Sequence, residues 1–399
     1  MRSSPTTLIR IDGAGPPPAP LPGRIAALET VVETAPVGAP PSDADRRLLE
    51  TYGAILQERA LRHPVPYHFV RELGKGRQGI VFLAIRQGAR GCLTRHAIKI
   101  HDPGIYSSAE TYWSDMARLA SQVSKLQPVN SDNLSMSEAY DEQDGIGYLQ
   151  MAVIDGIDLQ YLLDGTHVAI ARSQSSDEEW EHFLKLLFRV DEGRFRLQPG
   201  LAFYILRKVL MGLAVIHEAG YLHADIKPSN IMIDRNGGVK LVDFGRAVGI
   251  GEPITILIGS PLYMAPETHR LEPGYAQADI FGAGLVFLEM LRGQTMIDYA
   301  HLTDAQLLAF KLGLPDQLET LLPPHVASSK KLVRMLRRLM HPDYQRRFAS
   351  AREAEEYQYR LRGINREMGL PTDAEYDREL QCYLEKISDP ETGHLNPRL

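Results

Sequence analysis

The stretch 221–230, Tyr-Leu-His-Ala-Asp-Ile-Lys-Pro-Ser-Asn, with a later Asp-Phe-Gly tripeptide, constrains this chain more than any other part of its sequence. It places an acid (Asp225), a lysine (Lys227) and an amide (Asn230) at short spacing, and Asp243 supplies a second acid. Oxygen-bearing side chains bind hard cations such as magnesium, and a lysine ammonium neutralises phosphate charge. Phosphoryl transfer depends mainly on positioning and on such neutralisation. The combination therefore predicts transfer of a phosphoryl group from a metal-bound nucleotide to a hydroxyl.

Five further motifs accompany this stretch in a fixed order. They are Gly-Lys-Gly-Arg-Gln-Gly-Ile-Val at 74–81, His-Ala-Ile-Lys at 96–99, Gly-Ser-Pro-Leu-Tyr-Met-Ala-Pro-Glu at 259–267, Asp-Ile-Phe-Gly-Ala-Gly at 279–284 and Asp-Tyr-Gln-Arg-Arg at 343–347. Their order and spacing resemble the eukaryotic-like (Hanks-type) serine/threonine protein kinases, here most like the bacterial branch. The resemblance covers roughly residues 67–362.

The resemblance implies an α+β, bilobal protein-kinase fold. The N-lobe, about residues 67–152, would be an antiparallel β-sheet with the helix that the family calls αC. The C-lobe, about residues 155–362, would be mainly α-helical, with an insertion at about 165–197. ATP and Mg²⁺ are the implied cofactors, and ATP would lie in the cleft between the lobes.

The glycines at 74–79 also fit a dinucleotide-binding fingerprint, which requires a helix directly after them. Here the run Ile-Val-Phe-Leu-Ala-Ile at 80–85 follows, and such residues favour a β-strand. The sequence therefore predicts strand, glycine turn and strand, which is the arrangement of a kinase phosphate-binding loop.

The resemblance assigns the chemistry to five residues. Lys99 would neutralise the α- and β-phosphates. Asp225 would orient the attacking hydroxyl and accept its proton, and Lys227 would steady the transferred phosphoryl. Asn230 and Asp243 would hold Mg²⁺. An aspartate with an ordinary pKa of about 3.9 is ionised at neutral pH, as a proton acceptor must be.

The resemblance also assigns a nucleotide pocket. Met151 would be the gatekeeper, the backbone of Ala152 to Ile154 would contact adenine, and Asp158 would lie near the ribose. The complete nucleotide-binding set is Leu73, Gly74, Lys75, Gly76, Gly79, Val81, Ala97, Lys99, Met151, Ala152, Ile154 and Asp158.

The acid that would pair with Lys99 from the αC helix is not clear from the sequence. Residues 109–126 have helical periodicity, with Leu119 among the core positions. Asp115 lies at about the expected distance but is a shorter acid than glutamate, and Glu110 is rather close to Lys99 in sequence. Either Asp115 forms the pair, or the helix must shift to bring an acid in.

Other motif residues have structural roles in the resemblance. His223 would support the catalytic loop, and Asp279 would anchor the backbone of that loop. Glu267 and Arg347 would form a buried ion pair that fixes the activation segment to the C-lobe. Ser260 would face the acceptor residue of the substrate.

One departure from the family pattern concerns control of activity. Ala224 stands where many kinases have an arginine that binds an activation-loop phosphate. The hypothesis is that activity does not depend on such a phosphate. The segment from 243 to 267 is short, and Thr255 and Ser260 are the only serine or threonine residues in it.

The flanking segments have different compositions. Residues 1–44 are rich in proline and alanine and predict a disordered tail, or alternatively a proline-rich ligand for a partner. A helix is expected over 43–60 with Ser42 as its cap, and residues 45–66 are expected to form an N-terminal helical flank of the kinase. The insertion carries Ser-Ser-Asp-Glu at 175–178, which resembles a capping box, and reads as an extra packed helix or as a surface for a regulatory partner. A last capped helix is expected within 363–399.

Composition argues against nucleic-acid binders, membrane-spanning proteins and disulfide-rich proteins. A net charge of −6 over 399 residues lacks the basic bias of nucleic-acid binders. No apolar run approaches the roughly 18 residues that span a bilayer, and the start of the chain lacks the apolar core of a signal peptide. Two cysteines, Cys92 and Cys382, make no disulfide framework. The sequence predicts a cytoplasmic kinase that acts on protein Ser/Thr, without nucleic-acid binding or membrane insertion.

Two other functions stay open. A pseudokinase would bind nucleotide or partners without turnover, and Ala224 together with the unassigned αC acid favours it. The presence of Lys99, Asp225, Asn230 and Asp243 argues against it. A small-molecule phosphotransferase on a related fold would share the catalytic loop but would generally lack the Ala-Pro-Glu motif that this chain has.

Overall fold

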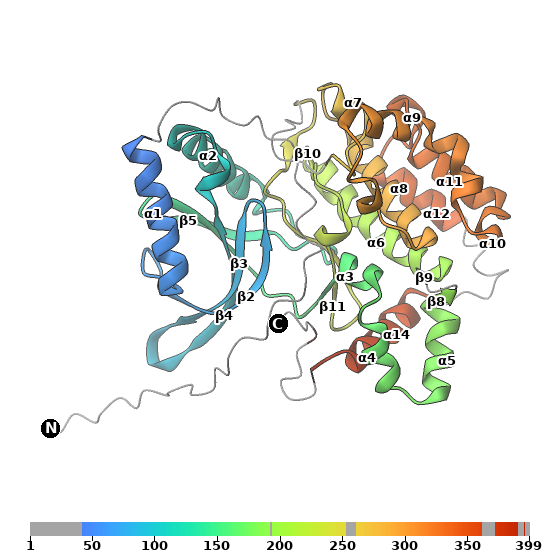
Figure 1. The fold of residues 1–399 in the computed structure, drawn as a ribbon, viewed down its shortest axis with the longest axis horizontal. Helices are drawn as coiled ribbons and strands as arrows, with labels where there is room; N and C mark the ends of the chain where they lie inside the picture. Colours follow the sequence, from blue (N-terminus) through green and yellow to red (C-terminus); the bar gives the residue numbers. More distant parts are fainter. Residues whose placement is uncertain (1–41, 192–193, 253–260, 361–371, 390–394, 396–399) are drawn as a thin grey trace.

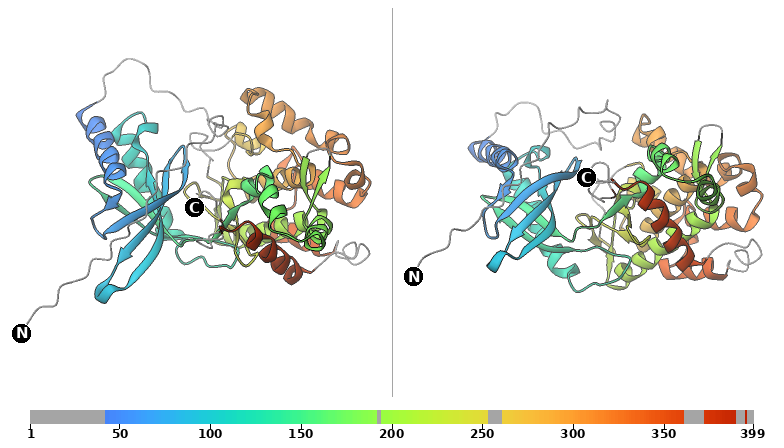
Figure 2. Two further views of the ribbon diagram at one scale, coloured as in Figure 1. Left: turned by 60° about the horizontal axis from the view of Figure 1, so that its bottom comes forward. Right: turned by 90° about the horizontal axis from the view of Figure 1, so that it is seen from below.

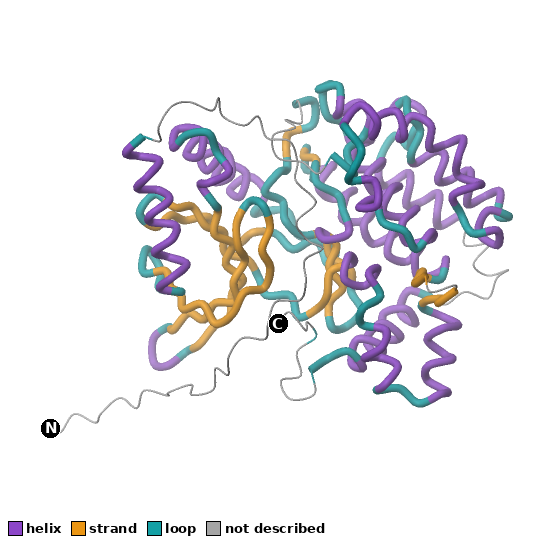
Figure 3. Tube along the Cα trace, in the orientation of Figure 1, coloured by secondary structure: helices purple, strands orange, loops and turns teal. Residues whose placement is uncertain are grey.

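The computed structural model describes the chain in five parts, which are residues 42–191, 194–252, 261–360, 372–389 and 395. Most of the expected tail at 1–44 lies outside these residues. Figure 1 shows two lobes side by side, a sheet-rich one that carries the early part of the chain and a helical one that carries most of the rest. Figure 3 shows the same division by secondary structure.

The N-lobe is built on an antiparallel six-stranded sheet in the order β1-β2-β3-β4-β6-β5. Its strands are β1 Ala60–Leu61, β2 Tyr67–Gly76, β3 Gly79–Gln87, β4 Leu93–His101, β5 Ser137–Gln143 and β6 Ile146–Met151. Strands β2 and β3 meet at a tight turn in which Gly76 pairs with Gly79. A β-carbon on Gly79 would lie 1.8 Å from the carbonyl oxygen of Ile100, so only glycine fits. The expected strand–turn–strand is confirmed, and no helix follows the glycines.

Two helices share the core of this sheet. Helix α1, Asp43–Glu58, buries Leu48, Tyr52 and Ile55 and is capped by Ser42, as predicted. Helix α2, Ala109–Leu126, is the αC helix and is capped by Ser108. The carboxylate of Asp45 in α1 also accepts a hydrogen bond from the backbone N–H of Ala109 at 2.7 Å. Because the first N–H groups of a helix lack partners within the helix, α1 helps to hold the start of α2.

The C-lobe is organised around α6, Pro199–Glu218, and α8, Ala276–Arg292, whose buried side chains form the centre of its core. Among the described residues α6 is the one helix long and apolar enough to cross a membrane. In its most apolar stretch of 18 residues, 67% is buried inside the protein, as in a core helix. The other helices of the lobe are α3 Leu159–Asp164, α4 Val168–Ser173, α5 Asp177–Leu186, α7 Pro266–His269, α9 Asp304–Leu321, α10 Pro324–Ala327, α11 Lys330–Leu339 and α12 Ala351–Arg360.

Short strands connect the helical lobe to the cleft. Strands β12 Val239–Leu241, β11 Ile231–Asp234 and β7 Gly156–Asp158 form a three-stranded sheet in that order. Strand β10, Tyr221–Leu222, pairs with β13, Val248–Gly249. This pairing places the catalytic loop, which follows β10, beside the residues that follow Asp-Phe-Gly.

The insertion folds into α4, α5 and a hairpin of β8 Phe188–Asp191 and β9 Arg194–Leu197. The predicted capping box lies one residue later than expected. Ser176, not Ser175, caps α5, because Glu179, not Glu178, returns the bond to the N-cap backbone.

The last described helix, α14 Asp373–Lys386, is capped by Thr372 and Glu375 as predicted. It lies against α4 and α6, as Figure 2 shows. Tyr383 of α14 hydrogen-bonds the buried ring of His167, and Lys386 pairs with Glu179 at 2.7 Å. Helix α14 therefore closes the insertion onto the C-lobe.

Candidate active site

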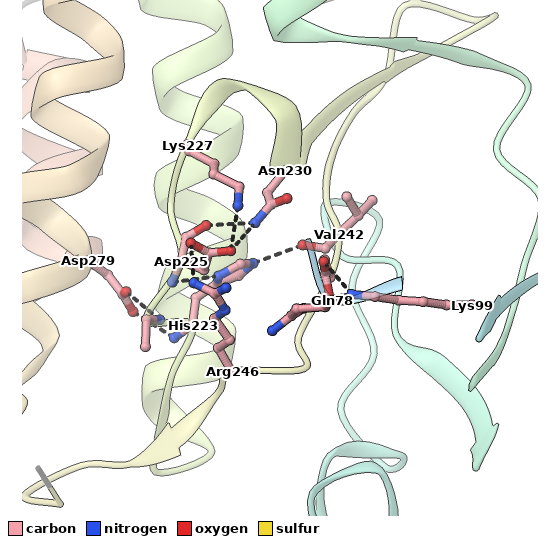
Figure 4. Close-up of polar contacts among 11 residues, drawn as sticks. Gln78, Lys99, His223, Asp225, Lys227, Asn230, Val242, Arg246 and Asp279 are labelled. Atoms are coloured by element: carbon pink, nitrogen blue, oxygen red, sulfur yellow. Dashed lines mark hydrogen bonds and ion pairs between the residues drawn. The ribbon is translucent and has the colours of Figure 1, made fainter. Parts of the chain in front are cut away.

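The catalytic loop connects β10 to a short 3₁₀ turn at Pro228–Asn230 and carries Asp225. The Asp225 Oδ2 atom accepts hydrogen bonds from Lys227 Nζ at 2.8 Å and Asn230 Nδ2 at 2.9 Å. Asn230 Nδ2 also donates to the Asp225 carbonyl at 2.8 Å. The structure thus brings the three predicted residues together around one carboxylate (Figure 4).

The backbone of this loop is held from below by Asp279 of α8. Its carboxylate accepts hydrogen bonds from the N–H groups of His223, at 2.8 Å, and Ala224, at 2.9 Å, and from His217 Nε2, at 2.8 Å. Ala224 has a φ of 60°, which is uncommon for a residue with a side chain. Asp279 accepts from the two backbone N–H groups of this part of the loop, so it lies where the sequence predicts an anchor of the loop.

His223 lies behind the catalytic loop rather than in the cleft. Its ring is fully buried, Nε2 contacts the Val242 carbonyl at 3.0 Å, and Nδ1 accepts from the Asp225 N–H at 3.3 Å. The ring also packs against Phe244, with ring centroids 4.7 Å apart. His223 therefore joins the catalytic loop to the Asp-Phe-Gly turn, which is a supporting position.

A second cation reaches Asp225 from a residue that the sequence did not single out. Arg246, which directly follows Asp-Phe-Gly, lies 3.2 Å from Asp225 Oδ1 through a guanidinium nitrogen. Burial raises the pKa of Asp225, but the positive charges of Lys227 and Arg246 lower it by more, so the pKa falls to about 2. Asp225 is therefore ionised at neutral pH. In the sequence, the only sign of this contact was that Arg246 directly follows Asp-Phe-Gly, while the residue before Asp225 is Ala224 and not arginine.

Lys99 of β4 contacts Asp243, the aspartate of the Asp-Phe-Gly motif. Its ammonium is 2.9 and 2.8 Å from the two carboxylate oxygens of Asp243 and 3.1 Å from Gln78 Oε1 in the glycine turn. Burial raises the pKa of Asp243, but the adjacent Lys99 ammonium outweighs it and holds this pKa well below its usual range. Gln78 is a further contact that sequence reasoning missed.

Asp115 does not pair with Lys99 in this structure, so the first of the two expected αC arrangements is wrong here. Its carboxylate accepts a hydrogen bond from Tyr106 at 2.7 Å and pairs with Arg118 at 2.8 Å. Arg118, one turn further along α2, contacts the Gly245 carbonyl at 3.1 Å. The side chain that links α2 to the Asp-Phe-Gly turn is therefore Arg118, and Asp115 forms its ion pair with that arginine instead of with Lys99.

The donor set fits a magnesium–nucleotide complex. Asn230 Nδ2 is committed to Asp225, so its carbonyl oxygen Oδ1 is the atom left for a metal. The two carboxylate oxygens of Asp243, which accept from Lys99 in this structure, are the other candidate ligands. In the described part of the chain no three acids, histidines or cysteines gather into a metal cluster. Two protein ligands without a full cage are typical of Mg²⁺ that is also bound by substrate phosphates.

Most of the expected nucleotide residues lie on strands β2, β3, β4 and β6 of the N-lobe sheet and on the segment that follows β6. Leu73, Gly74, Lys75 and Gly76 end β2, Gly79 and Val81 begin β3, and Ala97 pairs with Met151 across β4 and β6. Residues 152–155, which include Ala152 and Ile154, link β6 to β7 without regular secondary structure. Asp158 instead caps α3, accepting from the Tyr161 N–H at 2.7 Å. Its carboxylate is thus partly committed to the helix.

The activation segment is fixed at its far end by Glu267 and Arg347. The two side chains form a bidentate pair at 2.6 and 2.7 Å with 4% and 0% of their surfaces exposed. Arg347 also donates to the carbonyls of His341 and Gln277. The buried pair expected from the motifs is present, and Ser260 lies outside the described residues.

Comparison with known proteins gives one family. The sequence profile of the protein kinase domain matches residues 67–360. The chain is 36% identical over 169 residues to mitogen-activated protein kinase kinase kinase 1 of Arabidopsis thaliana, which covers 39% of this chain and 27% of that protein. It is 38% identical over 103 residues to the serine/threonine-protein kinase PknL of Mycobacterium tuberculosis, covering 25% and 26%, respectively.

A third relative is the probable serine/threonine-protein kinase PknB of Corynebacterium glutamicum, 38% identical over 102 residues, which is 24% of this chain and 16% of that protein. These matches span less than a third of each relative's length. The domain match covers most of this chain, including the N-lobe sheet from β2 onward and the helical lobe through α12. This chain belongs to the protein kinase family.

Proposed function

We propose that this protein is an ATP-dependent serine/threonine protein kinase that transfers the γ-phosphate of Mg-ATP to a protein hydroxyl, in a signalling role. The observation that carries the proposal is the convergence of Lys227, Asn230 and Arg246 on Asp225, opposite Asp243 and Lys99. A lysine two positions after the base, here Lys227, is the pattern of the serine/threonine kinases that this sequence resembles. The serine/threonine kinase names of the bacterial relatives support the same substrate class.

The residues divide the reaction between them. Asp225 accepts the proton as the serine or threonine oxygen attacks the γ-phosphorus. The bond between that phosphorus and the bridging oxygen breaks, and ADP leaves with the electron pair. Lys227 lies beside Asp225 and neutralises charge on the transferred group. Mg²⁺ held by Asp243 and Asn230 would neutralise the remaining phosphate charge.

Label from γ-labelled ATP should appear on serine or threonine of a generic basic acceptor protein when magnesium is present. Chelation of magnesium is the matched control and should abolish transfer. ATP binding without transfer would instead support a pseudokinase. Transfer to small-molecule hydroxyls with none to protein would support the related phosphotransferases.

Arg246 gives a prediction about the base. Arg246→Met should lower kcat by roughly 10- to 100-fold, because hydrogen bonds to charged groups contribute about 1.5–3 kcal/mol. The loss of a positive neighbour raises the pKa of Asp225, and only ionised Asp225 accepts a proton. The acid limb of the kcat–pH profile should therefore move to higher pH. Arg246→Lys, which keeps the charge, is the control, and an equal fall in both variants would contradict an electrostatic role.

Thr255 gives a prediction about control. Because Ala224 supplies no arginine for an activation-loop phosphate, Thr255→Ala should retain the rate of protein phosphorylation within about twofold. Thr255 lies outside the described residues. Initial rates of wild type and variant at equal concentration check this, and a collapse in the variant would show that phosphorylation of this loop is required.

We also propose a cytoplasmic location and a regulatory partner that binds through the insertion or the proline-rich N-terminus. Cys92 and Cys382 are free thiols, which supports a reducing compartment. Cell fractionation tests the location. Comparison of partners recovered with the full chain and with variants that lack 1–41 or carry a mutated α5 surface tests the second point.

A further inference from the structure

Lys311 is a buried charge that the chemistry described so far does not use. It lies in α9, and its side chain is 0% exposed. Its ammonium donates to the carbonyl oxygens of Pro261 and Met264, the latter at 2.8 Å, and contacts His269 Nε2 at 2.9 Å. An isolated buried ammonium is strongly unfavourable. These acceptors are backbone atoms of one loop and a ring of α7, so the charge holds that loop.

The loop held in this way faces the catalytic centre. Tyr263 and Met264 line the same small cavity as Asp225 and Ile226. The loop directly follows Ser260 in sequence. The loop 261–264 therefore lies beside the residue to which a protein substrate would present its hydroxyl.

A second buried side chain fixes the same loop. Tyr263 donates its hydroxyl hydrogen to Glu289 Oε1 at 2.8 Å, and Glu289 is 2% exposed on α8. Lys311 holds the backbone before and after Leu262-Tyr263, whereas Glu289 holds the Tyr263 side chain. The conformation of the loop is thus set by contacts from α8 and α9 beneath it.

We propose that Lys311 is a positioning residue for protein-substrate binding, because it holds the loop 261–264 in the shape that receives the substrate beside Asp225. This inference rests on the proposed protein kinase function. It assigns Lys311 no part in ATP binding, since its hydrogen bonds go to Pro261, Met264 and His269 and not to the residues expected to bind the nucleotide.

The state of the Lys311 proton gives the inference a second consequence. Burial lowers the pKa of Lys311 to about 7, although Asp304 on the same helix acts to raise it. Burial and Lys311 lower the pKa of His269 on α7 to about 4, so its ring is neutral and can accept a hydrogen bond. The ammonium donates three charge-assisted bonds, whereas the neutral amine has two N–H groups and weaker bonds. The hold on the loop should weaken as pH rises through about 7.

Two variants test this. Lys311→Met keeps a long apolar side chain in the buried site but donates no hydrogen bond, and it should raise KM for the acceptor protein about tenfold. KM for ATP should stay within about twofold of wild type. Wild-type KM for the acceptor should rise between pH 6 and pH 8, and this rise should be absent in Lys311→Met because nothing titrates at that position.

Lys311→Gln keeps uncharged N–H donors and should give a KM between the other two, without the pH dependence. If Lys311→Met does not fold, the Lys311→Gln profile decides. An acceptor KM and pH profile equal to wild type in a folded variant would overturn the inference, as would an equal rise in both KM values. Absence of any transfer to protein by wild type would instead contradict the proposed function.

Discussion

Asp225→Asn is expected to lower the rate of phosphoryl transfer by about 10²–10⁴-fold while ATP still binds, because general-base assistance typically contributes that much. The amide cannot accept the substrate proton. It also presents an N–H group toward Lys227 and Arg246, where an ionised carboxylate now accepts. Single-turnover rates with saturating ATP would give the loss in the chemical step, and nucleotide titration would give the affinity.

The matched control is Asp316→Asn, the same chemical change at an exposed position of α9. It should leave both measurements unchanged. A rate for Asp225→Asn within a few-fold of wild type would remove Asp225 from the role of base. A loss of ATP binding together with activity would point to collapse of the cleft, since Asn230 and Lys227 both depend on Asp225 for a hydrogen-bond partner.

Arg347→Met is expected to lower the free energy of unfolding of the C-lobe by about 3–5 kcal/mol, because it leaves the carboxylate of Glu267 buried without its partner. Backbone carbonyls of His341 and Gln277 lose a donor as well. Denaturant unfolding followed by circular dichroism, with wild type and variant side by side, measures the change.

Two further variants separate the causes. Arg352→Met removes an arginine whose pair with Glu218 is more than half exposed on both sides, and it should leave the unfolding curve nearly unchanged. Adding Glu267→Gln to Arg347→Met removes the stranded charge and should recover part of the loss. A double variant less stable than Arg347→Met alone would show that the buried charge is not the cause.

Local signals in the sequence determined the elements that frame the site. The caps Ser42 and Thr372 start their helices as predicted, because a side-chain oxygen next to an apolar helical pattern satisfies an N–H group of the same few residues. The glycine turn at 76–79 can form because Gly79 has no side chain that would collide with the Ile100 carbonyl. The capping box of α5 was placed one residue early, since Ser175 and Ser176 each have a glutamate three residues later and the folded helix uses Ser176 with Glu179.

The sequence by itself also determined which residues meet at the centre of the site. Asp225, Lys227 and Asn230 converge because their spacing is short and one loop carries all three. Asp279 reaches the loop as the motif order indicated. These contacts follow from spacing along the chain and from the family resemblance.

Only the tertiary structure decided the partners of the charges. Lys99 contacts Asp243 rather than Asp115, Arg118 contacts the Gly245 carbonyl, and Lys311 holds a loop far from it in sequence. A charged side chain takes the partner that the packing of helices and strands brings within reach. Many acids and carbonyls are chemically equivalent partners, so spacing along the chain cannot choose between them.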